Sequence, residues 1–286
     1  MPGSSIASLL RAASTRLAAA GVPDPLVDAE LLLGHVRGLG RGEVQAATVR
    51  GDTLTGDEAE RFETALARRE AREPLQHITG VAPFRHLTLA VGPGVFVPRP
   101  ETEGVVQHAI DALLHAPEAE PIGVDLGTGS GAIALAMATE VPHARVFAAE
   151  LSPDAYAWAR RNTARAANLT LVLADMADAF PELDGLASVV VSNPPYVPDD
   201  AIPRDPEVRL HDPAMALYGG ADGLDLVRTL SHRALRLLRP GGLLVIEHGE
   251  LQGADIRRLL EDDGWRATAT HRDLTLRDRS TTALRP

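Results

Sequence analysis

The stretch VDLGTGSGAIALAMA, residues 124–138, joins a short apolar run, a glycine-rich turn and an apolar helical pattern without interruption. Three glycines at alternate positions, Gly127, Gly129 and Gly131, allow the backbone to pass close to a ligand because they carry no Cβ. The helix that follows presents free N–H groups and the positive end of its dipole. The stretch therefore predicts a strand, turn and helix that bind a nucleotide-like cofactor, in preference to a tight connection without a ligand.

Short apolar runs alternate with helical patterns on both sides of this turn, from residue 120 onward. The runs predicted as strands are IGVDL, ARVFAAE, LTLVLAD, ASVVVSN and GGLLVIEHG, and the patterns predicted as helices are GAIALAMATE, PDAYAWARRNTARAA and GLDLVRTLSHRALRLL. Alternation of this kind is typical of βαβ units. It predicts an α/β fold with a doubly wound, Rossmann-like and mostly parallel sheet.

The preceding third of the chain has a different periodicity. Residues 4–72 show helical spacing in three pieces, with Thr55 as the N-cap of the third piece. The period then changes to two, and residues 75–98 are predicted to form a β-hairpin linker. PRPETEGVVQHAIDALL starts the next helix, with Glu101 and Glu103 near its positive end. The predicted domains are therefore 1–74 (helical), 75–98 (hairpin) and 99–286 (α/β).

The composition excludes several kinds of chemistry. The 286 residues contain neither cysteine nor lysine, which excludes disulfides, thiolate ligands, Schiff bases and a P-loop lysine. The ten histidines show no metal-ligand spacing, so no metal site is predicted. A net charge of −11 argues against an extended nucleic-acid surface. The N-terminal segment is predicted as a helix and not as a signal peptide, which favours a cytoplasmic protein outside the membrane.

These patterns do not decide which cofactor binds at the turn. Gly127, Gly129 and Ala132 fit the dinucleotide pattern, and Glu150 ends the next predicted strand, where an acid could hold ribose hydroxyls. The turn alone does not distinguish NAD from S-adenosylmethionine. Asp175 and Met176 follow the run LTLVLA and could contact a purine amino group and its face, although Asp175 could instead cap a turn.

The stretch VVVSNPPYVPDD, residues 189–200, ends a buried strand in a rigid turn. A planar amide nitrogen is a poor nucleophile, and two acceptors on its N–H bonds would align it with a leaving group. The Asn193 side-chain oxygen and the Pro194 carbonyl are predicted to be these acceptors, with Tyr196 stacked on the planar group. Alignment of this kind contributes about 7 to 11 kcal/mol to a transfer reaction. The motif therefore predicts methyl transfer to a planar nitrogen.

The sequence resembles a family along nearly its whole length. The segments that carry the resemblance are ITGVAPFRHLTLAV, FVPRPETE, DLGTGSGAIAL, NPPYV, DPAMALYGGADGLD, PGGLLVIEHGELQ and DLTLRDR. In this order they resemble the class I S-adenosylmethionine-dependent methyltransferases that carry a (D/N)PPY motif. Among these, the resemblance is to the bacterial release-factor glutamine methyltransferases.

The resemblance implies S-adenosylmethionine as cofactor and, as partner, a class I peptide chain release factor, methylated on the glutamine of its Gly-Gly-Gln loop. It implies that Glu150 holds the ribose and Met176 lies beside the adenine. The residues implied to line the rest of the cofactor are Gly127, Thr128, Gly129, Ser130 and Gly131. Those implied to hold the glutamine are Asn193, Pro194, Pro195 and Tyr196. Those implied to close the cleft are Phe96, Pro98 and Arg99.

Two residues depart from the family pattern, His77 in place of tyrosine and Asp212 in place of glutamate, and both are expected to affect only local packing. Three other functions fit part of the sequence. An N6-adenine or other exocyclic-amine nucleic-acid methyltransferase would use the same motif, but the acidic charge and the absence of lysine disfavour it. A nicotinamide oxidoreductase would leave NPPY unexplained. The third alternative is a non-catalytic protein that binds release factor through the helical domain.

Overall fold

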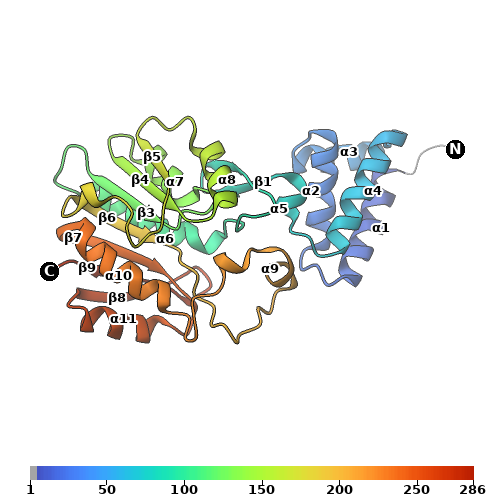
Figure 1. Ribbon diagram of the computed structural model, residues 1–286. Helices are drawn as coiled ribbons and strands as arrows, with labels where there is room; N and C mark the ends of the chain where they lie inside the picture. Colours follow the sequence, from blue (N-terminus) through green and yellow to red (C-terminus); the bar gives the residue numbers. More distant parts are fainter. Residues whose placement is uncertain (1–4) are drawn as a thin grey trace. The chain divides into compact units, whose positions relative to one another are not determined.

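The computed structural model describes residues 5–286 and divides the chain into two compact units (Figure 1). Residues 1–4 of the predicted helical domain lie outside the described part. The first unit contains the chain through Val81 together with Arg204–His211, and the second contains Ala82–Pro203 and Asp212–Pro286. Each unit has its own apolar core.

The first unit is helical, but the prediction of three helical pieces was wrong. Its helices are α1 (Ile6–Ala19), α2 (Pro25–Arg37), α3 (Arg41–Arg50), α4 (Gly56–Glu70) and the short α5 (Leu75–Thr79). Helix α3 was missed because only Val44 and Ala47 of its side chains are buried, so its apolar pattern is weak. Thr55 is confirmed as an N-cap, since its side chain accepts a hydrogen bond from the Glu58 N–H at the start of α4.

Helix α9 (Pro206–His211) belongs to the first unit although it follows the NPPY motif in the sequence. Glu207 forms ion pairs with Arg69 at 2.7 Å and with Arg72 at 3.0 Å. Arg69 is buried and also donates a hydrogen bond to Asp28 at 2.7 Å. Buried charges of this kind require partners, and Glu207 and Asp28 supply them to Arg69 in the first unit.

The predicted hairpin is shorter than residues 75–98. Its strands are β1 (Val81–Phe84) and β2 (Leu87–Ala90). Leu75–Thr79 is helical because Leu75 and Ile78, three residues apart, both pack against the core of the first unit. Residues 91–98 form no strand, and they contain two prolines, which cannot donate to a strand ladder.

The second unit contains a seven-stranded sheet that confirms the predicted α/β fold. In spatial order its strands are β5 (Leu169–Leu173), β4 (Arg145–Glu150), β3 (Ile122–Leu126), β6 (Ala187–Ser192), β7 (Leu238–Glu247), β9 (Asp278–Leu284) and β8 (Arg266–Arg272). The first five run parallel, and β9 is antiparallel to both β7 and β8. All five strands predicted from apolar runs are present, whereas the more polar β8 and β9 were not predicted.

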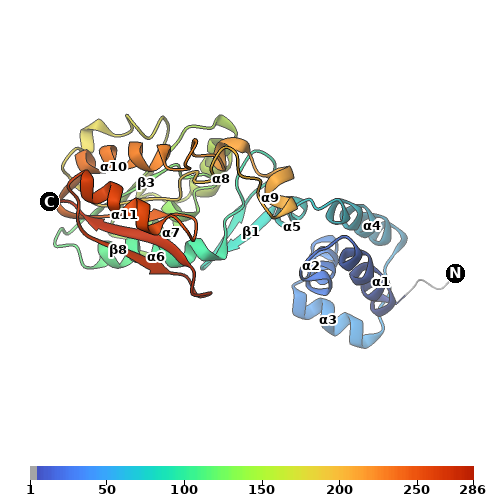
Figure 2. The same cartoon turned by 90° about the horizontal axis from the view of Figure 1, so that it is seen from below.

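Helices cover both faces of this sheet (Figure 2). One apolar core joins the sheet to α6 (Pro100–Leu114) and α7 (Ala132–Glu140), with α8 (Pro153–Thr163) at its margin, and the other joins it to α10 (Asp225–Leu237) and α11 (Gly253–Asp262). The carboxyl ends of the five parallel strands lie along one edge, which we call the carboxyl edge. Open α/β sheets bind ligands there. In residues 5–286, no helix is long and apolar enough to cross a membrane.

Candidate active site

The glycine-rich turn connects β3 to α7 at the carboxyl edge. Gly127, Gly129 and Gly131 have φ values of 75°, 58° and 84°, in the left-handed region that favours glycine. A Cβ added at Gly129 would meet no other atom within 4 Å, so there is open space beside the backbone here. The turn therefore has both the conformation and the room for a ligand that approaches the main chain.

Asp125 lies beneath this turn and was not among the predicted site residues. Its carboxylate is fully buried, and Oδ2 accepts hydrogen bonds from Thr128 Oγ1 at 2.5 Å and from Ala134 N at 3.1 Å. Among the described residues Oδ1 has no hydrogen-bond partner. Burial raises the pKa of Asp125 to about 7. A free acceptor at this turn fits a cofactor with N–H donors, such as the amino group of S-adenosylmethionine.

Glu150 ends β4 and lies against the same turn. Its Oε2 accepts a hydrogen bond from the Gly129 N–H at 2.7 Å, and its Oε1 accepts one from the Ser152 N–H at 2.8 Å. Each carboxylate oxygen keeps a second acceptor position. Glu150 thus orders the turn directly, and its contact with ribose hydroxyls stays a prediction.

The other predicted cofactor residues surround the turn. Thr128 and Ser130 are buried, and the Ser130 carbonyl accepts a hydrogen bond from Asn162 Nδ2 at 2.9 Å. Met176 is buried, and its Cε would lie 3.5 Å from a Cβ at Gly127. Asp175 is exposed and caps a turn, because its Oδ1 accepts from the Ala177 N–H at 2.9 Å. The turn-capping alternative for Asp175 is therefore observed.

The NPPY motif is fixed beside the glycine turn by neighbouring strands. In the parallel pair of β3 and β6, Asp125 is opposite Val191, and Ser192 Oγ donates a hydrogen bond to the Leu126 carbonyl at 2.5 Å. Within residues 5–286, neither the Asn193 side chain nor the Pro194 carbonyl makes a hydrogen bond. Both predicted acceptors are thus available at the carboxyl edge.

Two further elements hold the backbone of the motif. The Tyr196 carbonyl accepts a hydrogen bond from Gln252 Nε2 at 2.9 Å, and Gln252 Oε1 accepts one from the Gly249 N–H at 2.9 Å. A Cβ at Gly223 would lie 2.3 Å from the Tyr196 carbonyl oxygen, and one at Gly219 would lie 2.4 Å from that of Pro195. These close approaches explain why the segment LYGGADG is rich in glycine, a signal that could have identified it as support for the motif.

Tyr196 and Glu247 are titratable groups at this end of the site. Exclusion of water, with a smaller effect from the negative charge of Glu247, raises the pKa of Tyr196 to about 12, so the phenol stays neutral at pH 7. Glu247 ends β7 and is 2% exposed. Burial raises its pKa to about 7, against the lowering effects of the Thr102 hydroxyl and the Arg279 charge. The sequence analysis had not identified Glu247.

The residues predicted to close the cleft are half-buried. The Arg99 guanidinium lies 4.9 Å from the centroid of the Phe96 ring, and its Nη2 pairs with Asp212 Oδ2 at 2.8 Å. Asp212 was expected to affect only local packing, but its buried carboxylate is the ion-pair partner of a predicted site residue. His77 is buried in the first unit, in α5. Closure of a cleft by Phe96, Pro98 and Arg99 stays a prediction.

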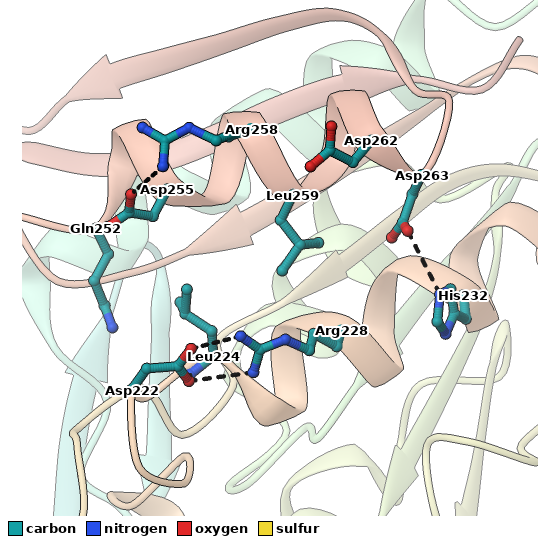
Figure 3. Close-up of a pocket in the computed structure, with 10 residues that line it drawn as sticks. All are labelled: Asp222, Leu224, Arg228, His232, Gln252, Asp255, Arg258, Leu259, Asp262 and Asp263. Carbon is teal, nitrogen blue, oxygen red and sulfur yellow. Dashed lines mark hydrogen bonds and ion pairs between the residues drawn. The ribbon is translucent and has the colours of Figure 1, made fainter.

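Histidines and acids do not gather into a metal site in residues 5–286. A groove of about 500 Å³ does lie between α10 and α11 (Figure 3). Its charged side chains pair with one another, as in Asp222–Arg228 and Asp255–Arg258. Gln252 lies at one end of the groove and donates a hydrogen bond to the Tyr196 carbonyl of the NPPY motif. We therefore place the candidate active site at the glycine turn and NPPY, not in this groove.

Comparisons with known proteins find relatives for both units. Residues 8–80 match the family model described as PrmC N-terminal domain, and residues 124–204 match the one described as methyltransferase domain. A "Release factor glutamine methyltransferase" from Streptomyces coelicolor is 52% identical over 95% of this chain and 95% of its own. A "4-amino-L-phenylalanine/4-methylamino-L-phenylalanine methyltransferase" from Streptomyces pristinaespiralis is 39% identical over 98% of this chain and 95% of its own.

Solved structures support the fold. The hMettl16 catalytic domain, in complex with a MAT2A 3'UTR hairpin, matches with a TM-score of 0.54 and 16% sequence identity. The match covers 79% of this chain and 80% of that one. At this identity the likeness shows a shared methyltransferase fold alone.

Proposed function

This chain belongs to the family of release factor glutamine methyltransferases, and we propose that it methylates the side-chain amide nitrogen of the glutamine in the Gly-Gly-Gln motif of class I peptide chain release factors. The methyl donor is S-adenosylmethionine, which supplies a methyl group on a positively charged sulfur. The observation that carries the proposal is the juxtaposition of two free acceptors, Asn193 Oδ1 and the Pro194 carbonyl, with a glycine turn open to a ligand.

One group of residues would bind the cofactor, and a second group would bind the substrate amide. At the cofactor end, Gly129 gives room for close approach, and Asp125 and Glu150 present acceptors beside it. At the substrate end, Asn193 and Pro194 would accept from the two N–H bonds of the target amide. This arrangement favours the pyramidal nitrogen that can attack.

Tyr196 fits a stacking role and not that of a base. A phenol is protonated at pH 7 even at its ordinary pKa, and burial raises the pKa of Tyr196 further, to about 12; the Tyr196 backbone is held by Gln252. A protonated ring on a backbone held in this way can orient a planar amide without taking its proton. Rate enhancement then comes mainly from alignment in a cleft that excludes water.

We also propose that the helical first unit recognises the release factor. Residues 8–80 match the family model described as PrmC N-terminal domain, whereas the glycine turn and NPPY both lie in the second unit. A cytoplasmic location goes with this proposal, because the acceptor acts in translation. Direct binding of nucleic acid is not expected for a chain with net charge −11 and no lysine.

The direct test is mass spectrometry of a release factor incubated with the protein and S-adenosylmethionine. We expect one added methyl group on the peptide that contains Gly-Gly-Gln. A release factor with glutamate in place of that glutamine is the control, and it should gain no methyl group. Methylation elsewhere, or none at all, would refute the proposed function.

A second candidate substrate comes from the Streptomyces pristinaespiralis relative, whose name gives 4-amino-L-phenylalanine as substrate. Its amino group is also a planar nitrogen, so the same two acceptors could bind it. Incubation of the protein with 4-amino-L-phenylalanine and labelled S-adenosylmethionine separates the two candidates. Our proposal predicts transfer to the release factor in preference to the free amino acid.

A further inference from the structure

The exposed apolar side chains of the second unit are concentrated at the carboxyl edge. Among the described residues of this unit, the five most exposed large apolar side chains are Leu274 (103%), Leu251 (87%), Leu276 (75%), Ile202 (74%) and Met215 (60%). Four of them lie in the loops after β6 and β7 or in the turn between β8 and β9, and Met215 lies in the short 3-10 helix Ala214–Ala216. Exposed apolar groups gathered in one region, unlike scattered ones, are typical of interaction sites.

The turn between β8 and β9 presents two of these leucines in an ordered conformation. Asp273 Oδ1 accepts hydrogen bonds from the backbone N–H and the hydroxyl of Thr275, at 2.8 and 2.6 Å. The Asp273 N–H donates to the Arg277 carbonyl at 2.9 Å, which closes the turn. Leu276 has φ 64°, a conformation that leucine rarely adopts. The turn thus holds Leu274 and Leu276 in solvent at a conformational cost.

One arginine connects this turn to the end of β7. Arg279 Nε donates to Asp273 Oδ2 at 3.2 Å, and its Nη1 donates to the His248 carbonyl at 3.4 Å. The charge of Arg279 also acts on Tyr196, where it opposes the rise in the pKa of the phenol. The leucine-bearing turn is therefore held against the loop that follows β7, which contains His248 and Gln252.

The loop after β7 joins the same surface. Leu251 lies in this loop, and its neighbour Glu250 forms an ion pair with Arg277 of the turn at 3.6 Å. The next residue, Gln252, donates to the Tyr196 carbonyl. Two leucine-bearing loops from different parts of the sequence are thus joined to each other, and one of them is bonded to the backbone of NPPY.

From this continuity we infer that Leu251, Leu274 and Leu276 form a docking surface for the protein that carries the target glutamine, which contacts it through an apolar patch next to its methylated loop. We call these three residues the leucine rim. The inference rests on the proposed function and goes beyond it, because it assigns recognition of the acceptor to the second unit as well as the first. A free amino acid as methyl acceptor would be too small to bind to this surface.

The test uses the full-length protein with both turn leucines replaced, Leu274→Gln with Leu276→Asn. Asparagine tolerates the left-handed conformation at position 276, so the turn should keep its shape. The matched control is Leu186→Gln, since Leu186 is 54% exposed but directly precedes β6 at the opposite edge of the sheet. We expect kcat/KM for an intact release factor to fall roughly tenfold or more in the double variant and to stay unchanged in the control.

Three accompanying measurements make the result decisive. The melting temperature and the affinity for S-adenosylmethionine should match the wild type in both variants. If the double variant methylates release factor as fast as the control does, the inference is wrong. If its size-exclusion profile changes from dimer to monomer, the leucines serve self-association and the inference is also wrong. Failure of the wild type to methylate any release factor would instead refute the proposed function, and the docking role with it.

Discussion

Asn193 offers its amide oxygen at the carboxyl edge without a competing hydrogen bond from the described residues. Most half-buried amides in folded proteins are bonded to neighbours, so a free one at the end of a buried strand is a feature of a binding site. The proline that follows contributes a second free carbonyl. We therefore expect reactivity at this site to depend on acceptors that the fold leaves without a hydrogen-bond partner.

We expect Asn193→Ala to lower the methylation rate by roughly 10² to 10³, by analogy with the loss of one oxyanion-hole donor. The variant leaves one N–H bond of the bound glutamine without an acceptor and also loses alignment. Single-turnover kinetics at saturating cofactor would measure the rate, and calorimetry should show little change in cofactor affinity. Asn193→Asp keeps an acceptor oxygen and should retain more activity. Equal loss in both variants would contradict the acceptor role.

Glu247 predicts a pH dependence of stability. Its folded pKa of about 7 exceeds the ordinary 4.5, so the folded state binds the proton more tightly than the unfolded state does. The stabilisation is complete below pH 4.5 and is lost as the pH rises through about 7. Glu247→Gln resembles the protonated form and lacks this dependence. Its stability relative to wild type should increase between pH 5 and 8, by up to about 3 kcal/mol.

Urea unfolding of both proteins at several pH values, without cofactor, measures this difference. Asp125, whose pKa is also raised by burial, is present in both proteins and cancels in the comparison. A constant difference in unfolding free energy across this pH range would show that Glu247 does not titrate there.

At the scale of elements, the site consists of loops that are held by neighbouring loops. The segment LYGGADG, before α10, lies in direct contact with the backbone of Pro195 and Tyr196. Gln252, next to α11, contacts the same backbone. The NPPY turn is thus positioned from two sides by segments that follow it in the sequence.

Gly223→Ala should therefore lower the methylation rate by more than the strain of a left-handed alanine would explain. Gly223 and Gly241 both have φ 73°, but a Cβ at Gly223 would meet the Tyr196 oxygen at 2.3 Å, whereas one at Gly241 would meet its nearest atom at 3.9 Å. Each alanine pays about 1–2 kcal/mol for the left-handed conformation. We expect Gly241→Ala to keep its methylation rate and Gly223→Ala to lose at least tenfold. Similar rates in both variants would disprove the contact.

Some helices and strands could be predicted from the pattern of apolar residues, and others could not. The strands buried on both faces and the glycine turn were predicted because their signals are local and strong. Helix α3 and strand β8 were missed because few of their side chains are buried, and β9 was missed because three of its four buried residues, Ser280, Thr281 and Thr282, are polar. The 75–98 linker was predicted too long because its short apolar runs do not distinguish strand from helix or loop.

At the scale of the whole molecule, the chain enters the first unit twice. Helix α9 follows NPPY in the sequence but is held by Arg69 and Arg72 of the first unit. The segment that leaves the NPPY motif is therefore anchored at its far end by the unit that we propose to recognise the acceptor.

Removal of residues 1–81 should preserve cofactor binding and abolish most of the methylation of release factor. All the observed contacts of the glycine turn lie within the second unit, so calorimetry should still detect binding of S-adenosylmethionine. Methylation of intact release factor should fall at least a hundredfold, because α9 loses its partners and the acceptor loses the recognition unit. Loss of cofactor binding together with methylation would argue against this division of labour.

The sequence by itself determined the alternating α/β architecture and the glycine-rich turn, and it predicts Asn193 with its two prolines as the substrate end. These features follow from neighbouring residues, whose periodicity, glycine content and rigid turns act over short distances along the chain. Only the tertiary structure decided that Glu207 belongs to the first unit, that Asp212 pairs with Arg99, and that Gln252 supports Tyr196. These contacts join residues that are far apart in sequence. Their partners are selected by burial and by the need to pair buried charges and polar groups, which no local pattern records.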